Sequence, residues 1–101
     1  FSLTALSMTG QNIWDAGAAA IATTLKQNNT LKVLNLSFND IKTVGGMALS
    51  NSLKFNTGLE HCNFAGNHFC DKVGRNLAQM LHVNRSIETF DLHSNDFSVR
   101  R

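Results

Sequence analysis

The sequence contains no proline and only two cysteines among its 101 residues. The absence of proline is typical of a structure in which nearly every backbone N–H donates a hydrogen bond. The cysteines, Cys62 and Cys70, are too few for the disulfide framework that stabilises many small secreted domains. We therefore interpret both as free thiols, which favours a reducing, cytoplasmic environment.

Strong charge and long apolar segments are also missing. The formal net charge is +2, which is too small to indicate nucleic acid or an anionic membrane as the partner. No apolar run approaches the roughly 18 residues of a membrane-spanning helix. No positively charged stretch followed by an apolar one marks a signal peptide. The sequence therefore predicts a partner that is neither nucleic acid nor membrane.

What the sequence does contain is a 28-residue repeat without insertions. The segment LKVLNLSFN, residues 31–39, is followed one repeat later by LEHCNFAGN and two repeats later by IETFDLHSN. One repeat earlier stands LTALSMTGQ, residues 3–11. A constant period of this length is the signature of stacked repeat proteins.

Each unit has two halves with different apolar periods. The first half alternates, as Leu34 and Leu36 do, which predicts strands near 4–8, 32–36, 60–64 and 88–92. The second half places apolar residues four apart, as in Ile21 and Leu25, which predicts helices near 16–27, 44–55 and 72–83. The sequence therefore predicts an α/β protein.

Polar residues recur at both ends of each expected helix. One repeat position just before the helical pattern always carries a side-chain oxygen, in Asp15, Thr43 and Asp71. A second position, just after the pattern, is always asparagine, in Asn28, Asn56 and Asn84. We predict N-terminal caps at the first position and left-handed, helix-ending residues at the second.

These units resemble leucine-rich repeats. The residues that carry the resemblance are Leu31, Leu34, Leu36, Asn39 and Ile41; Leu59, Cys62, Phe64, Asn67 and Phe69; and Ile87, Phe90, Leu92, Asn95 and Phe97. The first unit supplies Leu3, Leu6, Met8, Gln11 and Ile13. The repeat length, with a helix in every unit, is similar to that of the ribonuclease-inhibitor-like subclass.

The resemblance implies a curved solenoid, a segment of a horseshoe, with a parallel β-sheet on the concave side and α-helices on the convex side. It also implies a structural ladder of buried asparagines that bond to the backbone of the loop leaving each strand, namely Asn39, Asn67 and Asn95. Gln11 departs from this pattern, which puts the first rung of the ladder in doubt.

We assign residues 1–101 to one repeat domain with units 3–30, 31–58 and 59–86 and a partial unit 87–101. A single strand-plus-helix unit cannot bury its own apolar face, so about three or more units must stack. Apolar residues of the outermost units, such as Leu6 and Phe90, would be uncovered at the ends of this stack. We therefore expect further repeats or domains of the same chain, or partner surfaces, at both ends.

The outward positions of the expected strands would form the concave surface. They are polar with one exposed aromatic residue, a composition typical of protein-binding surfaces. The recognition residues that we predict are Lys32, Asn35, Phe38, His61, Asn63, Asp91 and His93. The alternatives are a merely solvated sheet face and a contact surface on the convex side, where Trp14 and Val44 are unusually apolar.

No motif indicates catalysis, a cofactor or a metal. A glycine-rich phosphate loop with lysine and a nucleophile-elbow serine are both missing from the sequence. His61, Asp91 and His93 share a predicted face, but two strand positions and a diagonal neighbour rarely supply converging metal ligands. Cys70 precedes an expected helix near Lys72, where a lowered thiol pKa is conceivable. We predict a protein that is not an enzyme and holds no cofactor or metal.

Together these patterns predict a non-catalytic, cytoplasmic module for protein–protein interaction or scaffolding. The resemblance also allows two alternatives, a GTPase-activating-type regulator of a small GTPase and the ligand-sensing repeat region of an innate immune receptor. The sequence leaves the identity of the protein partner open.

Overall fold

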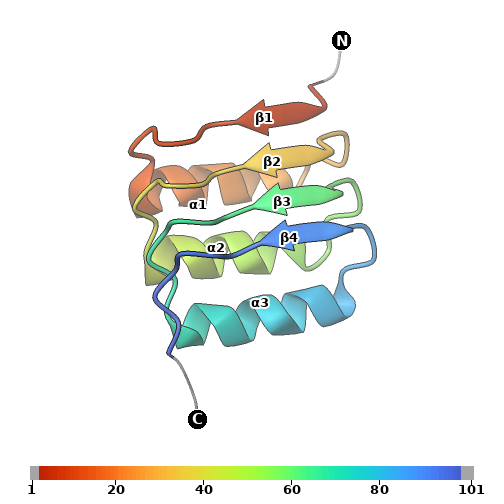
Figure 1. The fold of residues 1–101 in the computed structure, drawn as a ribbon. Coiled ribbons are helices and arrows are strands. Elements are labelled where there is room, and N and C mark those ends of the chain that lie inside the picture. Colours follow the sequence, from red (N-terminus) through yellow and green to blue (C-terminus); the bar gives the residue numbers. More distant parts are fainter. Residues whose placement is uncertain (1–2, 99–101) are drawn as a thin grey trace.

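The computed structural model describes residues 3–98, in which strands and helices alternate. The elements are β1 (Ala5–Ser7), α1 (Trp14–Leu25), β2 (Val33–Asn35), α2 (Thr43–Leu53), β3 (His61–Asn63), α3 (Asp71–Val83) and β4 (Thr89–Asp91). Figure 1 shows them as successive turns of one stack, which confirms the predicted α/β class. The predicted domain also includes residues 1–2 and 99–101, which lie outside the described residues.

The four strands form one parallel sheet in the order β1-β2-β3-β4. Each strand residue pairs with the residue one repeat later, so that Leu6 faces Leu34, Leu34 faces Cys62 and Cys62 faces Phe90. The sequence repeat is therefore also the register of the sheet. Equivalent side chains consequently stand in columns that cross all four strands.

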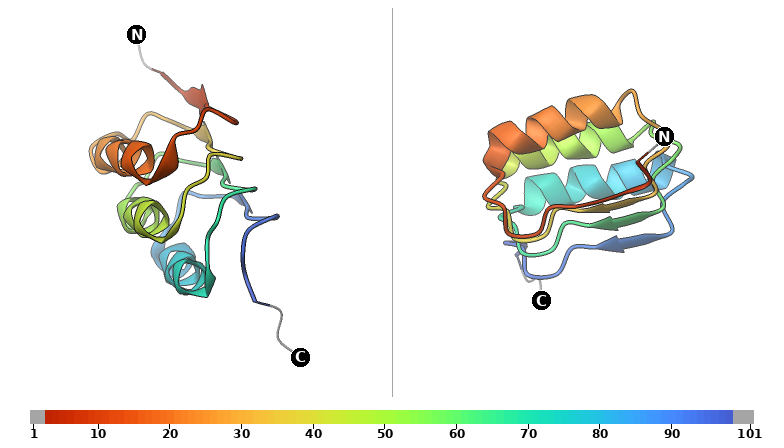
Figure 2. Two further views of the ribbon diagram at one scale, coloured as in Figure 1. Left: turned by 90° about the vertical axis from the view of Figure 1, so that its left-hand side faces the viewer. Right: turned by 90° about the horizontal axis from the view of Figure 1, so that it is seen from above.

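The sheet lines the concave side of a curved stack. Figure 2 shows the helices in one layer and the strands in the other. Neighbouring strands lie about 4.8 Å apart, whereas packed helices need about 8–10 Å. A layer of helices joined to a layer of strands must therefore bend toward the strands. The predicted solenoid, with sheet inside and helices outside, is confirmed.

The core lies between the two layers. Its fully buried side chains include Leu34, Leu36, Ile41, Leu49, Leu53, Phe64, Phe69 and Leu77. The Phe64 ring meets Phe69 and Phe90 edge to face, with centroids 6.0 and 5.3 Å apart. Gly46 allows α2 to approach the next repeat, since a Cβ there would lie 2.9 Å from both Phe69 Cε1 and Val73 Cγ1.

The structure shifts the predicted boundaries by one or two residues. Helix α1 begins and ends two residues earlier than predicted, at Trp14 and Leu25, and α2 ends at Leu53. Each strand has three residues instead of the five predicted. Within residues 3–98, no helix combines the length and the apolar character needed to cross a membrane.

The predicted N-terminal helix caps are wrong. Asp15, Thr43 and Asp71 lie within the first turn of their helices, and no side-chain cap hydrogen bond is formed there. Asp15 Oδ1 instead accepts from the Lys42 N–H at 2.6 Å, and Asp71 Oδ1 accepts from the Ser98 N–H at 2.8 Å. These carboxylates face the next repeat, so they satisfy its backbone rather than their own.

The predicted left-handed helix ends are also wrong. None of Asn28, Asn56 and Asn84 has a positive φ, and Asn84 is extended with φ −67° and ψ 134°. Asn56 Nδ2 instead donates to the carbonyls of Leu25 (2.9 Å) and Asn28 (2.7 Å) in the preceding repeat. Asn84 Nδ2 does the same with Leu53 (2.8 Å) and Asn56 (3.0 Å). These asparagines form a ladder between repeats, which we call the entry ladder because it precedes each strand.

A second asparagine ladder, which we call the exit ladder, follows the strands. Asn67, which is buried, donates from Nδ2 to the carbonyls of Leu36 (3.1 Å) and Phe64 (3.0 Å). Its Oδ1 accepts from the N–H groups of Asn39 (3.0 Å) and Ile41 (3.1 Å). One side chain therefore closes its own turn and binds the backbone of the preceding repeat.

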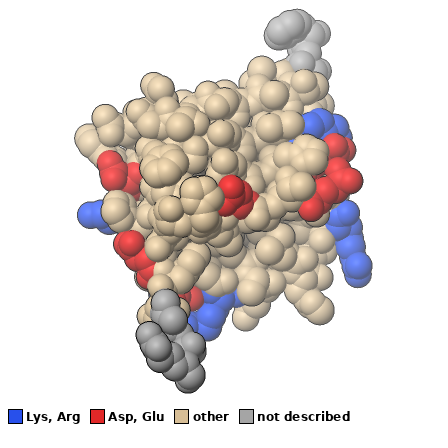
Figure 3. Space-filling model, viewed as in Figure 1, with Lys and Arg blue, Asp and Glu red and all other residues tan. Residues whose placement is uncertain are grey.

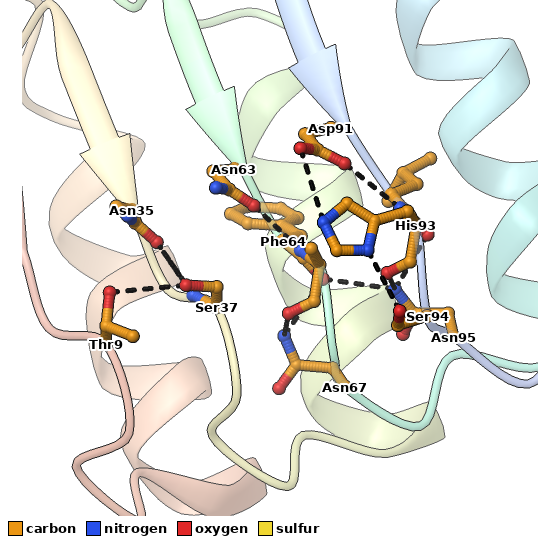
Figure 4. A network of polar contacts seen from close by, with 12 residues as sticks. Thr9, Asn35, Ser37, Asn63, Phe64, Asn67, Asp91, His93, Ser94 and Asn95 are labelled. Carbon is orange, nitrogen blue, oxygen red and sulfur yellow. Dashed lines mark hydrogen bonds and ion pairs between the residues drawn. The ribbon is translucent and has the colours of Figure 1, made fainter.

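The other exit-ladder positions repeat this arrangement. Asn39 Nδ2 donates to the Met8 carbonyl at 2.8 Å, and Asn95 Nδ2 donates to the Phe64 carbonyl at 3.1 Å (Figure 4). Gln11 occupies the same repeat position, and within residues 3–98 its side-chain Nε2 donates to the Thr9 carbonyl of its own turn at 3.2 Å. Gln11 lies in the first described repeat, so its bonding to a preceding repeat is not tested, and the doubt about the first rung stays a prediction.

Candidate functional site

The concave face carries a shallow hollow of about 620 Å³ over β2, β3 and β4. Its outward-pointing lining residues are Val33, Asn35, His61, Asn63, Thr89 and Asp91. Figure 3 views this face and shows Lys, Arg, Asp and Glu mostly toward its edges. The hollow is therefore a polar and largely uncharged surface with charged margins.

The column through Asn35, Asn63 and Asp91 crosses the middle of the hollow. Each Oδ1 accepts from the N–H two residues later, at 3.0 Å for Asn35 and Asn63 and 3.1 Å for Asp91 (Figure 4). These bonds fix the side-chain orientations. Among the residues that the structure describes, the Nδ2 groups of Asn35 and Asn63 have no hydrogen-bond acceptor, so both donors are available to a ligand.

Phe38 stands just beyond β2 in a left-handed conformation, with φ 59°. The equivalent positions Gly10, Gly66 and Ser94 also have positive φ, so the turn imposes this conformation in every repeat. A non-glycine residue pays on the order of 1–2 kcal/mol for it. The Phe38 side chain remains 54% exposed, and its ring lies against Gly66, where a Cβ would collide with it.

Charged and imidazole side chains line the rim where the strands begin, which we call the strand-start rim. Lys32 Nζ lies 3.9 Å from Glu60 Oε2, and His61 Nε2 lies 4.0 Å from Glu88 Oε2. His61 Nδ1 also shares a hydrogen bond of 2.8 Å with Thr89 Oγ1. The row thus holds lysine in one repeat and glutamate in each of the next two, with His61 beside the glutamates.

The predicted recognition residues separate into three groups on the concave side. The strand-start rim holds Lys32 and His61, the central column holds Asn35, Asn63 and Asp91, and the opposite rim holds Phe38 and His93. In the described part of the chain, no hydrogen bond or ion pair joins His61 to Asp91 or His93. His93 Nε2 pairs with Asp91 Oδ2 at 3.7 Å instead.

The sequence analysis missed a histidine clamp formed by His68, Asp40 and Asp96. His68 Nε2 lies 3.1 Å from Asp40 Oδ1, and Nδ1 lies 3.2 Å from Asp96 Oδ2. Hydrogen bonds to Asp40 and then Asp96 raise the pKa of His68. The signal was present in the sequence, because the three residues occupy one repeat position in consecutive units.

The two cysteine thiols have opposite properties. Burial raises the pKa of Cys62, whose side chain belongs to the core. Hydrogen bonds from the Thr43 side chain, 3.4 Å away, and then from the Val73 and Lys72 backbone lower the pKa of Cys70. The lowered pKa follows from these hydrogen bonds, whereas proximity to the charge of Lys72 was the reason given from the sequence.

Apolar side chains are also exposed away from the sheet. Trp14 is 59% exposed and lines a second hollow of about 460 Å³ with Asp15, Asp40, Lys42 and His68. Val44 on α2 is 71% exposed, and Phe55, just after α2, is 79% exposed. Phe55 did not stand out in the sequence, because its repeat position holds glutamine in the unit before and valine in the unit after.

Comparisons with known proteins agree on the architecture. A family model described as "Leucine Rich repeat" matches residues 27–50. A solved structure titled "Leiomodin-1 Actin-Binding Site 2 (ABS2)" is similar over 91% of this chain, with a TM-score of 0.85 at 18% sequence identity. The fold is a leucine-rich-repeat solenoid. The chain spans 54% of the length of that leiomodin structure. A search of curated protein sequences gives no significant match to this chain.

Proposed function

We propose that this leucine-rich-repeat chain is a non-catalytic protein-binding module that contacts its partner through the concave sheet face. The observation that carries the proposal is Phe38, which is exposed in a backbone conformation that disfavours bulky residues. Strain retained at an exposed position is typical of binding sites, because folding gains nothing from it. Large exposed aromatic residues are also the commonest anchors of protein interfaces.

The neighbouring polar groups suit the same role. Asn35 and Asn63 offer oriented amide donors, Asp91 supplies a carboxylate beside them and His93 an imidazole. Lys32 and His61 extend the surface to the strand-start rim. Interfaces commonly combine a buried aromatic anchor with such a polar surround. The partner that fits is a protein presenting an apolar pocket for Phe38 together with carbonyl or carboxylate acceptors.

Actin is the first partner to test, because the solved structure with the same fold is titled an actin-binding site. The other predicted roles, GTPase activation and ligand sensing in an immune receptor, have no particular contact in residues 3–98 to support them. We also propose the ribonuclease-inhibitor-like subclass and the units 3–30, 31–58, 59–86 and 87–101, supported by the constant sheet register. A cytoplasmic location is supported by the two free thiols.

The deciding variant is Phe38→Gly, which removes the anchor and suits the left-handed turn. We expect its melting temperature to equal or exceed that of the wild type, while affinity for the partner falls at least tenfold. Co-sedimentation with filamentous actin measures the affinity. Phe55→Ser is the control, because it removes a second exposed aromatic residue, which lies just after α2.

Two results would contradict the proposal in different ways. Absence of binding by the wild type would exclude actin as the partner. The proteins that wild type and Phe38→Gly retain from an extract would then be compared by mass spectrometry. Equal retention of every partner by the two chains, with loss in Phe55→Ser, would place the interface on the convex side.

A further inference from the structure

Two glutamates stand side by side on the strand-start rim. Glu60 and Glu88 occupy the same repeat position, and the Glu88 N–H donates to the Glu60 carbonyl at 2.7 Å. Like charges on adjacent strands repel each other. Lys32 approaches Glu60 at 3.9 Å, but within residues 3–98 no lysine or arginine lies within 4.0 Å of the Glu88 carboxylate. The two glutamates therefore carry more negative charge than Lys32 balances, which favours the binding of a further cation.

His61 presents a free ring nitrogen to these carboxylates. Its Nδ1 is engaged by Thr89 Oγ1 at 2.8 Å, which holds the ring and directs Nε2 toward Glu88. The 4.0 Å between Nε2 and Glu88 Oε2 is too long for a hydrogen bond. A histidine that binds a metal usually has its other ring nitrogen anchored by a hydrogen bond, as Nδ1 of His61 is here.

The geometry points to a divalent-metal site formed by Glu60, His61 and Glu88, with Zn²⁺ as the ion best suited to one imidazole and two carboxylates. The three ligand atoms lie within 4.8 Å of one another. Ligands about 2.1 Å from a tetrahedral ion are separated by about 3.4 Å. Closing the site requires shifts of about 1 Å, which the partly exposed glutamate side chains can make by rotation.

The site has three protein ligands and one open position. That position would accept water or a donor from a bound protein, as in other three-ligand zinc sites. Lys32 competes with the metal, because it pairs with the Glu60 carboxylate when no ion is bound. The site stands on these contacts alone and does not depend on the concave face being an interface.

Isothermal titration of the purified protein with Zn²⁺ tests the site. All variants carry Cys70→Ser, because the lowered pKa of that thiol makes it a competing ligand. We expect one bound ion per chain, with affinity reduced at least about tenfold by His61→Ala and by Glu88→Gln. Lys32→Gln should tighten binding several-fold, because it frees Glu60. His93→Ala, at another exposed histidine beside a carboxylate, should leave binding unchanged.

Each alternative outcome overturns a defined part of the inference. The site is excluded if saturable binding is absent below millimolar Zn²⁺, or if His61→Ala binds as tightly as the parent. Unchanged affinity in Glu60→Gln would remove Glu60 from the ligand set. Melting curves recorded without zinc show whether each variant is folded, and all these side chains are half-buried or exposed. Loss of binding in His93→Ala would place the ion at the opposite rim instead.

Discussion

The two asparagine ladders join the same repeats at opposite edges of the sheet, yet they are built differently. In both, Nδ2 donates to backbone carbonyls of the preceding repeat. The Oδ1 of Asn67 also accepts from the preceding repeat, at Asn39 and Ile41. The Oδ1 of Asn56 accepts from its own turn, at Gly58 (3.0 Å) and Leu59 (2.9 Å). In the exit ladder, both the Nδ2 and the Oδ1 of the side-chain amide bind the preceding repeat. In the entry ladder, only the Nδ2 does.

The largest expected effect is that of Asn67→Ala, in the exit ladder. The substitution leaves the buried N–H groups of Asn39 and Ile41 without their acceptor. The carbonyls of Leu36 and Phe64 each lose one side-chain donor and keep another, from Asn39 and Asn95. Each orphaned group costs about 1–3 kcal/mol before relaxation, so we expect the free energy of unfolding to fall by about 4 kcal/mol. Urea denaturation measures it. Asn51→Ala, on the exposed face of α2, is the control and should change stability by less than about 0.5 kcal/mol.

Asn56→Gly tests the entry ladder and should have the second-largest effect. A left-handed helix end would tolerate glycine without loss, since glycine is the preferred residue there. The observed cross-repeat bonds to Leu25 and Asn28 predict instead a loss of about 2–3 kcal/mol. Asn56→Ala should cost a similar amount. A glycine variant as stable as the wild type would show that the entry ladder contributes nothing between repeats.

The comparison also explains what the sequence could predict. The period, the alternation of Leu34 and Leu36 and the helical spacing of Leu49 and Leu53 identify the fold, because each is set by burial within one repeat. The pairing partners of Asn56 and Asp15 depend on a neighbouring repeat that lies a full period away. Local capping rules therefore assigned these side chains to their own helix ends, where isolated helices would use them.

For the candidate site too, the sequence predicted what is set within one repeat and missed what depends on turns and neighbouring side chains. Alternation along the strands correctly placed the side chains of Asn35, Asn63 and Asp91 on one face of the sheet. It could not show that the turn after each strand is left-handed, which places Phe38 in a conformation that disfavours bulky residues. Nor could it show which carboxylates each histidine approaches, because rotamers and loop positions decide that. The grouping of His61 with Glu88 emerges only in three dimensions, whereas the shared repeat position of His68 and Asp40 is visible in the sequence.

The smallest expected effect comes from the His68 clamp, which lies on the exit side but joins side chains rather than backbone. Asp40 and Asp96 raise the pKa of His68 in the folded protein. Protonated His68 therefore stabilises the fold fully below the ordinary histidine pKa of about 6.5, and this contribution is lost as the pH rises through the folded-state pKa. We expect the melting temperature of the wild type to exceed that of His68→Gln at pH 5.5, and the difference to shrink by pH 8.5. The effect should be small, because exposed ion pairs are screened by solvent.

His82→Gln is the control, because no carboxylate pairs with His82 in residues 3–98. A constant difference across this pH range would show that the clamp acts without its charge, as the asparagine ladders do.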